Sequence, residues 1–261
     1  MSNNRFVLLS FDVEEFDMPL EYNQQVPVAD QMRVGHEGLI ATMEIINNAA
    51  ATSTFFTTAN FAQTFPVDIK AIAEKHEIAS HTFFHSCFSP EHLLESKLSL
   101  EHITRKPVYG LRMPRMRHVE MSDVKKAGYI YDSSINPTWI PGRYNYRDKP
   151  RTVYTDEGVL RMPAAVSPNL RIPLFWLAFK NFPYAVFKSL AIQTLKHDGY
   201  LCLYFHPWEF VELKEYNIPQ YTKRYAGKGL QQRLVKLLKD LSAEGEFITM
   251  YDYLKLAKHT A

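Results

Sequence analysis

The chain has 261 residues, of which 46% are hydrophobic and 13% aromatic, enough for a sizeable buried core. Its 30 Lys and Arg residues nearly balance 28 Asp and Glu residues, so the composition does not favour a nucleic-acid-binding protein. The two cysteines, Cys87 and Cys202, are too few for a disulfide framework, although one bridge remains open.

The first residues, MSNNRFVLLSFDVEE, contain only a short apolar run before charged residues appear. A secretory signal peptide needs about 7–15 apolar residues after a basic start, followed by small residues at a cleavage site. We therefore interpret 6–11 as a first core strand and predict that the protein is cytoplasmic.

Short apolar runs then alternate with segments of helical periodicity. Strands are predicted at 6–11, 52–57, 77–80, 108–111, 129–132, 201–205 and 246–250. Helices are predicted at 36–49, 66–75, 90–105, 120–127, 184–198, 227–243 and 251–259. This alternation predicts right-handed βαβ units in an α/β fold, and the number of repeats favours a barrel over an open sheet.

Two segments interrupt the alternation. We expect 140–172 to be an irregular insertion with short β pieces. The stretch 172–192 is strongly apolar but contains Lys180, Pro183 and Lys188, whereas a membrane span needs about 20 residues with few or no charges. We interpret it as a loop followed by a core helix; the alternative is a membrane-surface or partner-binding face. No stretch resembles a linker, so we predict a single domain over 1–261.

Ionisable residues follow four of the predicted strands: DVE at 12–14, HTFFH at 81–85, RMPRMR at 112–117 and HPWE at 206–209. In a parallel α/β barrel the carboxyl ends of the strands form one rim, where functional residues collect. Each motif alone has an ordinary explanation, such as a solvated turn or a surface histidine pair. Their predicted placement on the same rim indicates a site.

The spacing of these residues suggests a metal centre. His81 and His85 are four residues apart, so in a helical or turn conformation both imidazoles face the same way. Asp12 and Glu14 are two apart and share one side of an extended segment. Two histidines and one carboxylate are a common catalytic Zn²⁺ set. One acid would bind the cation and the other accept a proton.

The sequence resembles the polysaccharide deacetylase (NodB-homology) family in five motifs that occur in the family's order. They are SFDVEE, HEIASHTFFHS, YGLRMP, GYIYDSSINP and YFHPWEF. The similarity is greatest to the branch with Asp-x-Glu in the first motif and His-Pro-Trp-Glu in the last, and it extends from about residue 6 to 255.

The resemblance implies a distorted (β/α)7-type barrel with a divalent metal, usually zinc. It implies hydrolysis of acetyl groups from N-acetylated, or sometimes O-acetylated, sugars of a polysaccharide or its lipid- or nucleotide-linked precursor. By position, Glu14, His81 and His85 become the metal ligands. Asp12 becomes the general base, and His206 the general acid.

Further roles follow from the same resemblance. Arg112 is expected to orient Asp12, and the backbone N–H near Arg115 to help hold the oxyanion. Trp139 and Trp208 are expected to stack on sugar rings or to belong to the core. The remaining acids, Glu15 and Asp17, are expected to be loop residues, and Glu209 to fix its loop through hydrogen bonds.

This chain also departs from the family pattern. Val13 and Glu14 stand where the common motif has Asp and Gly, so it remains open which of Asp12 and Glu14 binds the metal. The usual Asp-Trp motif that orients the catalytic histidine is replaced by YDSSINPTW, and we assign that role to Asp132.

Two alternatives remain. One is an intracellular amidase acting on a small cyclic or linear amide, which the lack of an export signal favours. The other is a metal- or sugar-binding homologue without turnover, which the presence of Asp12, Arg112 and His206 opposes. Oligomeric state cannot be predicted from the sequence.

Overall fold

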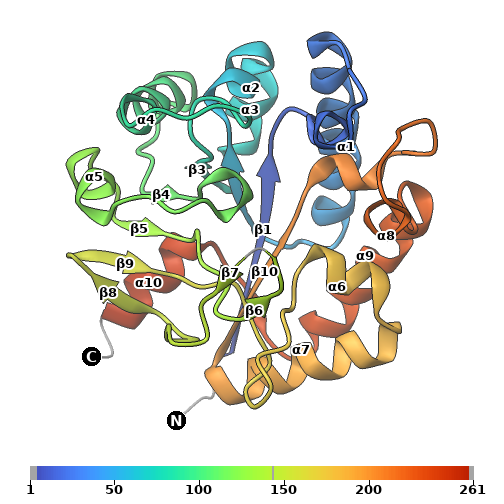
Figure 1. The fold of residues 1–261 in the computed structure, drawn as a ribbon. Helices are drawn as coiled ribbons and strands as arrows, with labels where there is room; N and C mark the ends of the chain where they lie inside the picture. The colour runs from blue at the N-terminus through green and yellow to red at the C-terminus, as the bar shows by residue number, and fades with distance from the viewer. Residues whose placement is uncertain (1–4, 143, 259–261) are drawn as a thin grey trace.

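The molecule is built around a curled, mostly parallel sheet, described for residues 5–142 and 144–258 in a computed structural model (Figure 1). The strand order is β10-β1-β2-β3-β4-β5-β9-β8, and β11 pairs with β1. The strands are β1 Phe6–Val13, β2 Thr54–Thr57, β3 Glu77–Ser80, β4 Gly110–Leu111, β5 Tyr131–Asp132, β8 Tyr154–Asp156, β9 Val159–Arg161, β10 Tyr200–Phe205 and β11 Glu246–Phe247. β8 and β9 are antiparallel, and β6 Trp139–Ile140 forms a separate hairpin with β7 Tyr144–Asn145.

Helices pack around this sheet (Figure 1). They are α1 Val28–Asn48, α2 Ala59–Thr64, α3 Pro66–Ile72, α4 Glu91–Thr104, α5 Met121–Lys126, α6 Trp176–Asn181, α7 Tyr184–Asp198, α8 Gln220–Lys223, α9 Lys228–Ser242 and α10 Met250–Lys258. Three 3-10 turns follow strand ends or loops: η1 Met18–Tyr22, η2 Pro114–Met116 and η3 Pro207–Phe210.

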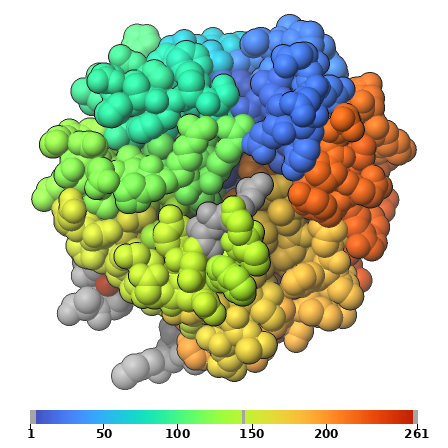
Figure 2. All heavy atoms as spheres, in the orientation of Figure 1, coloured from blue at the N-terminus to red at the C-terminus, as the bar shows by residue number. Residues whose placement is uncertain are grey.

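The sheet curls into a half-barrel with β10 and β8 as its edge strands, so the predicted barrel is confirmed in a distorted form. After β9 the chain continues irregularly, and the N–H of Ala165 donates to the carbonyl of Cys202 in β10, with 2.9 Å between nitrogen and oxygen. Residues from the N-terminal, middle and C-terminal thirds of the chain meet around the centre of one face (Figure 2). The irregular segment after β9 thus contacts the edge strand β10.

The alternation of side chains along β1 divides the core into two clusters. Leu8 packs inside the barrel with Phe56 and Met162, whereas Val7 and Leu9 belong to the larger cluster that includes residues of the outer helices. Because successive side chains of a strand point to opposite faces, Ser10 and Asp12 share the inner face with Leu8. The strand therefore delivers its acids to the interior of the barrel mouth.

The predicted elements largely agree with the structure, with local differences. The first helix begins at Val28 and not at 36, because Pro27 starts a longer helix in which polar Asp30 and Gln31 obscure the periodicity. The segment 140–172 contains the short strands β7, β8 and β9, and 172–192 forms α6 and part of α7 after a loop, as expected. Cys87 and Cys202 are free thiols, exposed and buried respectively.

Within the described ranges, no helix has the length and hydrophobicity needed to cross a membrane. The predicted end of the last helix at 259 lies outside the described residues.

Two glycines of α1 allow this helix to touch both chain segments that carry the polar rim. A Cβ atom on Gly35 would lie 2.6 Å from the carbonyl oxygen of Glu14, and one on Gly38 would lie 2.1 Å from that of Pro207. Neither contact has room for a methyl group, so α1 positions both segments through direct backbone packing.

This packing predicts that Gly38→Ala destabilises the fold. The added methyl group must displace the backbone of η3, and overpacking of this kind costs about 1–3 kcal/mol. Gly229→Ala in α9 is the matched control, because its Cβ would meet only ordinary contacts of 3.6 Å and more. Urea unfolding should show a lower midpoint for Gly38→Ala and an equal or higher midpoint for Gly229→Ala, and equal midpoints would contradict the packing argument.

Glu77, the first residue of β3, predicts that the stability of the fold depends on pH. Glu77 accepts hydrogen bonds from the hydroxyls of Thr54 and Tyr131 and from the N–H of Tyr251, and burial raises its pKa to about 7. Between about pH 4.5 and pH 7 the folded state therefore holds a proton on Glu77, whereas the unfolded state releases it near the ordinary glutamate pKa of 4.5.

Folding stability should consequently fall by at most about 3 kcal/mol as the pH rises from about 4.5 to 7, and then level off. Glu77→Gln should remove this part of the pH dependence, since a glutamine does not titrate. Unfolding free energies of both proteins at pH 5 and pH 8 test this, and an identical pH dependence in the two proteins would contradict it.

Candidate active site

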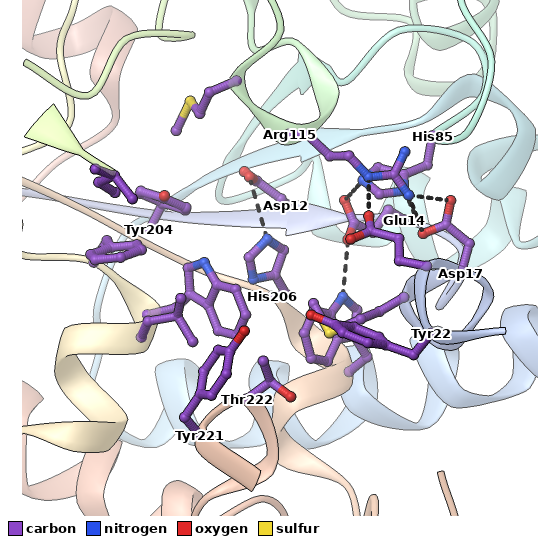
Figure 3. Close-up of a pocket in the computed structure, with 18 residues that line it drawn as sticks. Asp12, Glu14, Asp17, Tyr22, His85, Arg115, Tyr204, His206, Tyr221 and Thr222 are labelled. Atoms are coloured by element: carbon purple, nitrogen blue, oxygen red, sulfur yellow. Dashed lines mark hydrogen bonds and ion pairs between the residues drawn. The ribbon is translucent and has the colours of Figure 1, made fainter. Parts of the chain in front are cut away.

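The ends of β1, β3, β4 and β10 surround a pocket of about 150 Å³ at the mouth of the barrel (Figure 3). Asp12, Glu14, His85 and His206 line it, together with Arg115. The sequence-based expectation that these motifs share one rim is therefore met by the geometry. The other wall is largely apolar and aromatic: Met18, Tyr22, Met116, Ile140, Phe175, Trp176, Leu177, Tyr204, Tyr221 and Thr222.

Glu14, His81 and His85 form a buried cluster whose nitrogen and oxygen donor atoms all lie within 4.8 Å of one another. The Nε2 atoms of His81 and His85 lie 3.0 and 3.1 Å from Oε2 of Glu14. The Nδ1 atom of His81 lies 2.8 Å from the carbonyl oxygen of Arg112, which can only accept a hydrogen bond. Neutral His81 therefore carries its proton on Nδ1 and turns the lone pair of Nε2 toward Glu14.

The same arrangement occurs at His85, where a carboxylate replaces the carbonyl group. The Nδ1 atom of His85 lies 2.8 Å from Oδ1 of Asp17. Two imidazole lone pairs and a carboxylate oxygen thus converge, and such a set is stabilised by a shared positive charge. Histidine ligands whose second nitrogen donates to a carboxylate or carbonyl are the usual surroundings of a protein metal site. The residues present fit a divalent cation held by Glu14, His81 and His85.

Charges around Glu14 favour its ionised form. Burial alone would raise the pKa of Glu14, but His85, His206 and His81 lower it below its ordinary value. Burial lowers the pKa of His85, and the carboxylates of Glu14 and Asp17 more than compensate, so that its pKa is raised. The acidic cluster at the end of β1 is therefore tolerated because histidines and arginines face it.

Arg112 is fully buried and joins three strand ends. Its Nη1 atom donates to Oδ1 of Asp12 at 2.6 Å and to Oγ of Ser10 at 3.0 Å. Its Nη2 and Nε atoms donate to the hydroxyl and the carbonyl group of Ser133. The guanidinium also lies over the ring of Phe56, 4.0 Å from its centroid. Asp12 is consequently held by one oxygen, and its other oxygen faces the pocket.

His206 approaches that second oxygen, with 3.9 Å between its Nε2 and Oδ2 of Asp12 (Figure 3). Its Nδ1 atom lies 2.9 Å from Oε1 of Glu209, which also accepts the backbone N–H of His206 at 2.7 Å. Burial lowers the pKa of His206, but Glu14, Glu209 and Asp12 raise it above the ordinary value. The ring is thus fixed on one side and open to the pocket on the other.

The contact with His206 that we assigned to Asp132 is made by Glu209. Asp132 is buried and forms an ion pair with Arg161, 2.9 Å away, and it accepts the N–H of Ser134. Asp132 and Arg161 are direct neighbours in the parallel ladder of β5 and β9, so the carboxylate turns toward β9. Glu209 does more than fix its loop, because it contacts the ring of His206.

The three residues expected to bind substrate lie in different surroundings. Trp208 is buried but lines the pocket, and it stacks on His206 and donates its Nε1 proton to Oε1 of Glu14 at 3.0 Å. Trp139 is 54% exposed on the β6–β7 hairpin, and its neighbour Ile140 lines the pocket. Arg115 lines the pocket and forms ion pairs with Asp17 and Glu21. Its role in substrate binding stays a prediction.

Two acids that we took for loop residues are buried parts of this region. Asp17 connects His85 to Arg115, and Glu15 accepts hydrogen bonds from Thr58 and Asn60 of the neighbouring segment. The sequence signal for them was the density of acids after β1, which a solvated loop would explain equally well. Only the folded arrangement shows their partners.

Comparisons with known proteins place this geometry in a structural family. No protein-family model and no curated protein matches the sequence. Solved structures do: a Mycobacterium smegmatis protein assigned as a polysaccharide deacetylase superposes with a TM-score of 0.68 at 16% identity, covering 100% of this chain and 93% of that one. A Pseudomonas aeruginosa protein with the same assignment gives 0.65 at 15% identity, covering 96% and 90%. The chain has the polysaccharide deacetylase fold.

The polysaccharide deacetylase fold also occurs with a different activity. Puue allantoinase superposes with a TM-score of 0.64 at 16% identity, covering 96% of this chain and 89% of that one. A fold shared by enzymes with different substrates does not determine an activity, so function must be argued from the pocket.

The contact between Asp17 and His85 predicts that Asp17 supports metal binding indirectly. Asp17→Asn should lower the affinity for Zn²⁺ about 10–100-fold, the usual effect of losing a partner that orients a histidine ligand. Glu21→Gln is the matched control, since Glu21 contacts the same Arg115 but is not hydrogen-bonded to a histidine of the cluster. Competition with a chromophoric chelator measures both affinities, and equal values would remove Asp17 from this role.

Proposed function

We propose that the protein is a metal-dependent hydrolase that removes acetyl groups from N-acetylated, or O-acetylated, sugars of a polysaccharide or its lipid- or nucleotide-linked precursor. One observation supports this above all. A single pocket combines the donor set of Glu14, His81 and His85 with a carboxylate, Asp12, and an imidazole, His206, that lie 3.9 Å apart. Amide hydrolysis needs a proton acceptor and a proton donor near one polarised carbonyl group.

Glu14, His81 and His85 would hold the metal, for which Zn²⁺ suits a set of two nitrogens and one oxygen. A bound divalent cation supplies Lewis acidity, which polarises a carbonyl group and lowers the pKa of water. Of the two acids left open by the sequence, Glu14 is the one within reach of both histidines, while Asp12 is engaged by Arg112. The geometry favours Glu14 as the ligand and leaves Asp12 for proton transfer.

Asp12 is suited to act as the general base. Arg112 binds one of its oxygens and holds the carboxylate in place, while the other oxygen remains directed toward the pocket. There it accepts a proton from the water that attacks the acetyl carbon. Ser10 and Ser133 keep the guanidinium in place, so the base is held by a rigid network.

His206 is suited to act as the general acid. Its raised pKa keeps the ring protonated closer to neutral pH, and Glu209 holds Nδ1 so that Nε2 faces the reacting group. When the carbon–nitrogen bond breaks, the proton on Nε2 passes to the leaving amine. The proton removed by Asp12 and the proton given by His206 thus balance the hydrolysis.

A second candidate is hydrolysis of a small cyclic or linear amide. The similarity to the Puue allantoinase structure favours it, as does the modest pocket volume of about 150 Å³. Acetate release from N-acetylhexosamine oligosaccharides, compared with hydrolysis of ureide-type amides under matched metal loading, separates the two candidates. Turnover of the ureides alone would replace the deacetylase proposal.

The role of Asp12 predicts the behaviour of Asp12→Asn. Asparagine keeps a hydrogen-bond acceptor for Arg112 but is a poor base, so acetate release should fall by about a hundredfold or more. Metal content should stay the same, because the variant retains Glu14, His81 and His85. Exposed Asp30→Asn serves as the control and should match the wild type.

Two outcomes would contradict this assignment. Unchanged acetate release in Asp12→Asn would remove Asp12 from the mechanism. Loss of the metal together with activity would show that Asp12 is a ligand, and Glu14 would then need another role.

A further inference from the structure

The lysine of helix α6 is buried directly behind the proposed general acid. The side chain of Lys180 is 0% exposed, and its Nζ lies 2.9 Å from Oε2 of Glu209. The ammonium group also donates to the carbonyl oxygen of Thr222 and lies 5.0 and 5.5 Å from the ring centroids of Trp176 and Trp208. A lysine is rarely buried completely unless it is paired, so this position needs an explanation.

Glu209 divides its two oxygens between Lys180 and His206. Oε2 forms the ion pair with Lys180, and Oε1 accepts from the backbone N–H and lies 2.9 Å from Nδ1 of the His206 ring. Burial raises the pKa of Glu209, but Lys180 and His206 lower it below the ordinary value. The carboxylate therefore depends on two cations to remain ionised.

These contacts connect an outer helix to the reacting group. We propose that Lys180 is a positioning residue of the site, which holds the carboxylate of Glu209 in place and through it the ring of His206. This inference rests on the proposed function. It extends that function, because Lys180 contacts neither the metal cluster nor Asp12 and so adds a residue outside both. The segment 172–192, in the sequence an apolar stretch interrupted by Lys180, Pro183 and Lys188, thereby acquires a part in the chemistry.

The charges that face His206 come from four parts of the fold. Asp12 and Glu14 belong to β1 and its end, Arg112 follows β4, and Glu209 lies in η3. Lys180 on α6 is the cation behind Glu209. When His206 releases its proton to the amine, Lys180 still neutralises Glu209, so the buried carboxylate is never left without a counter-ion. Without Lys180 the positive charge that balances Glu209 is that of the imidazolium, which then holds its proton more tightly.

The test compares Lys180→Met, Glu209→Gln and the double variant in the metal-loaded full-length protein. Lys180→Met should lower kcat about tenfold or more with little change in KM, because the acid is impaired while substrate contacts remain. In the Glu209→Gln background, Lys180→Met should have no further effect, since Lys180 acts through Glu209. Lys188→Met, which removes a partly exposed lysine of α7, is the control and should match the wild type.

The pH dependence provides a result that a merely structural role would not produce. Lys180→Met removes the cation behind Glu209, so His206 should hold its proton to higher pH and the alkaline limb of kcat/KM should move to higher pH. Glu209→Gln removes the carboxylate that stabilises the imidazolium, so the limb should move to lower pH. The proposal would be overturned if both variants moved the alkaline limb in the same direction. It would also be overturned if the loss of activity in the double variant were the product of the losses in the two single variants. If Lys180→Met does not fold, the comparison of Glu209→Gln with the double variant still decides it, because equal activities are required.

Failure of this inference can be told apart from failure of the proposed function. NMR titration of the His206 ring in the same variants needs no turnover and should show the two opposite shifts. A wild-type protein that releases no acetate from any acetylated saccharide refutes the deacetylase activity. Unchanged His206 titration in Lys180→Met refutes the role of Lys180.

Discussion

The buried guanidinium of Arg112 is the constraint on which the rest of the site depends. Its side chain ties Asp12 of β1 to Ser133 at the end of β5, while its own carbonyl group fixes the tautomer of His81. One residue thus sets the orientation of the proposed base and of a proposed metal ligand. A buried arginine is costly unless its donors are used, and here β1 and the end of β5 provide the acceptors.

The mouth of the barrel concentrates buried charge that a protein selected for stability alone would avoid. Asp17 and Glu209 are each stabilised by a neighbouring cation, Arg115 and Lys180 respectively, and single changes leave an uncompensated charge. The backbone is also strained nearby, since Thr82 and Arg115 have positive φ angles of 64° and 56°. Strain of this kind persists where surrounding structure imposes it, and it often coincides with functional sites.

The fold leaves the choice of substrate to the pocket wall. Solved structures with this fold include proteins assigned as polysaccharide deacetylases and an allantoinase, so the barrel accommodates different substrates. In this chain the wall opposite the metal cluster is built by α6 and α8, with Trp176 and Tyr221 among its residues. The same α6 carries Lys180 behind Glu209. One segment outside the sheet therefore forms part of the pocket wall and also contacts Glu209.

The sequence by itself determined most strands of the sheet and four groups of ionisable residues that follow them. Strand periodicity is local: a spacing of two places Asp12 on the inner face with Leu8, and apolar runs that end in ionisable residues mark the rim. Tertiary structure alone decided the partners. Glu209 and not Asp132 contacts His206, Asp17 supports His85, and Lys180 reaches Glu209, because each of these contacts depends on how separate segments pack. A local pattern specifies the face that a residue occupies, whereas the group it meets there comes from another part of the chain.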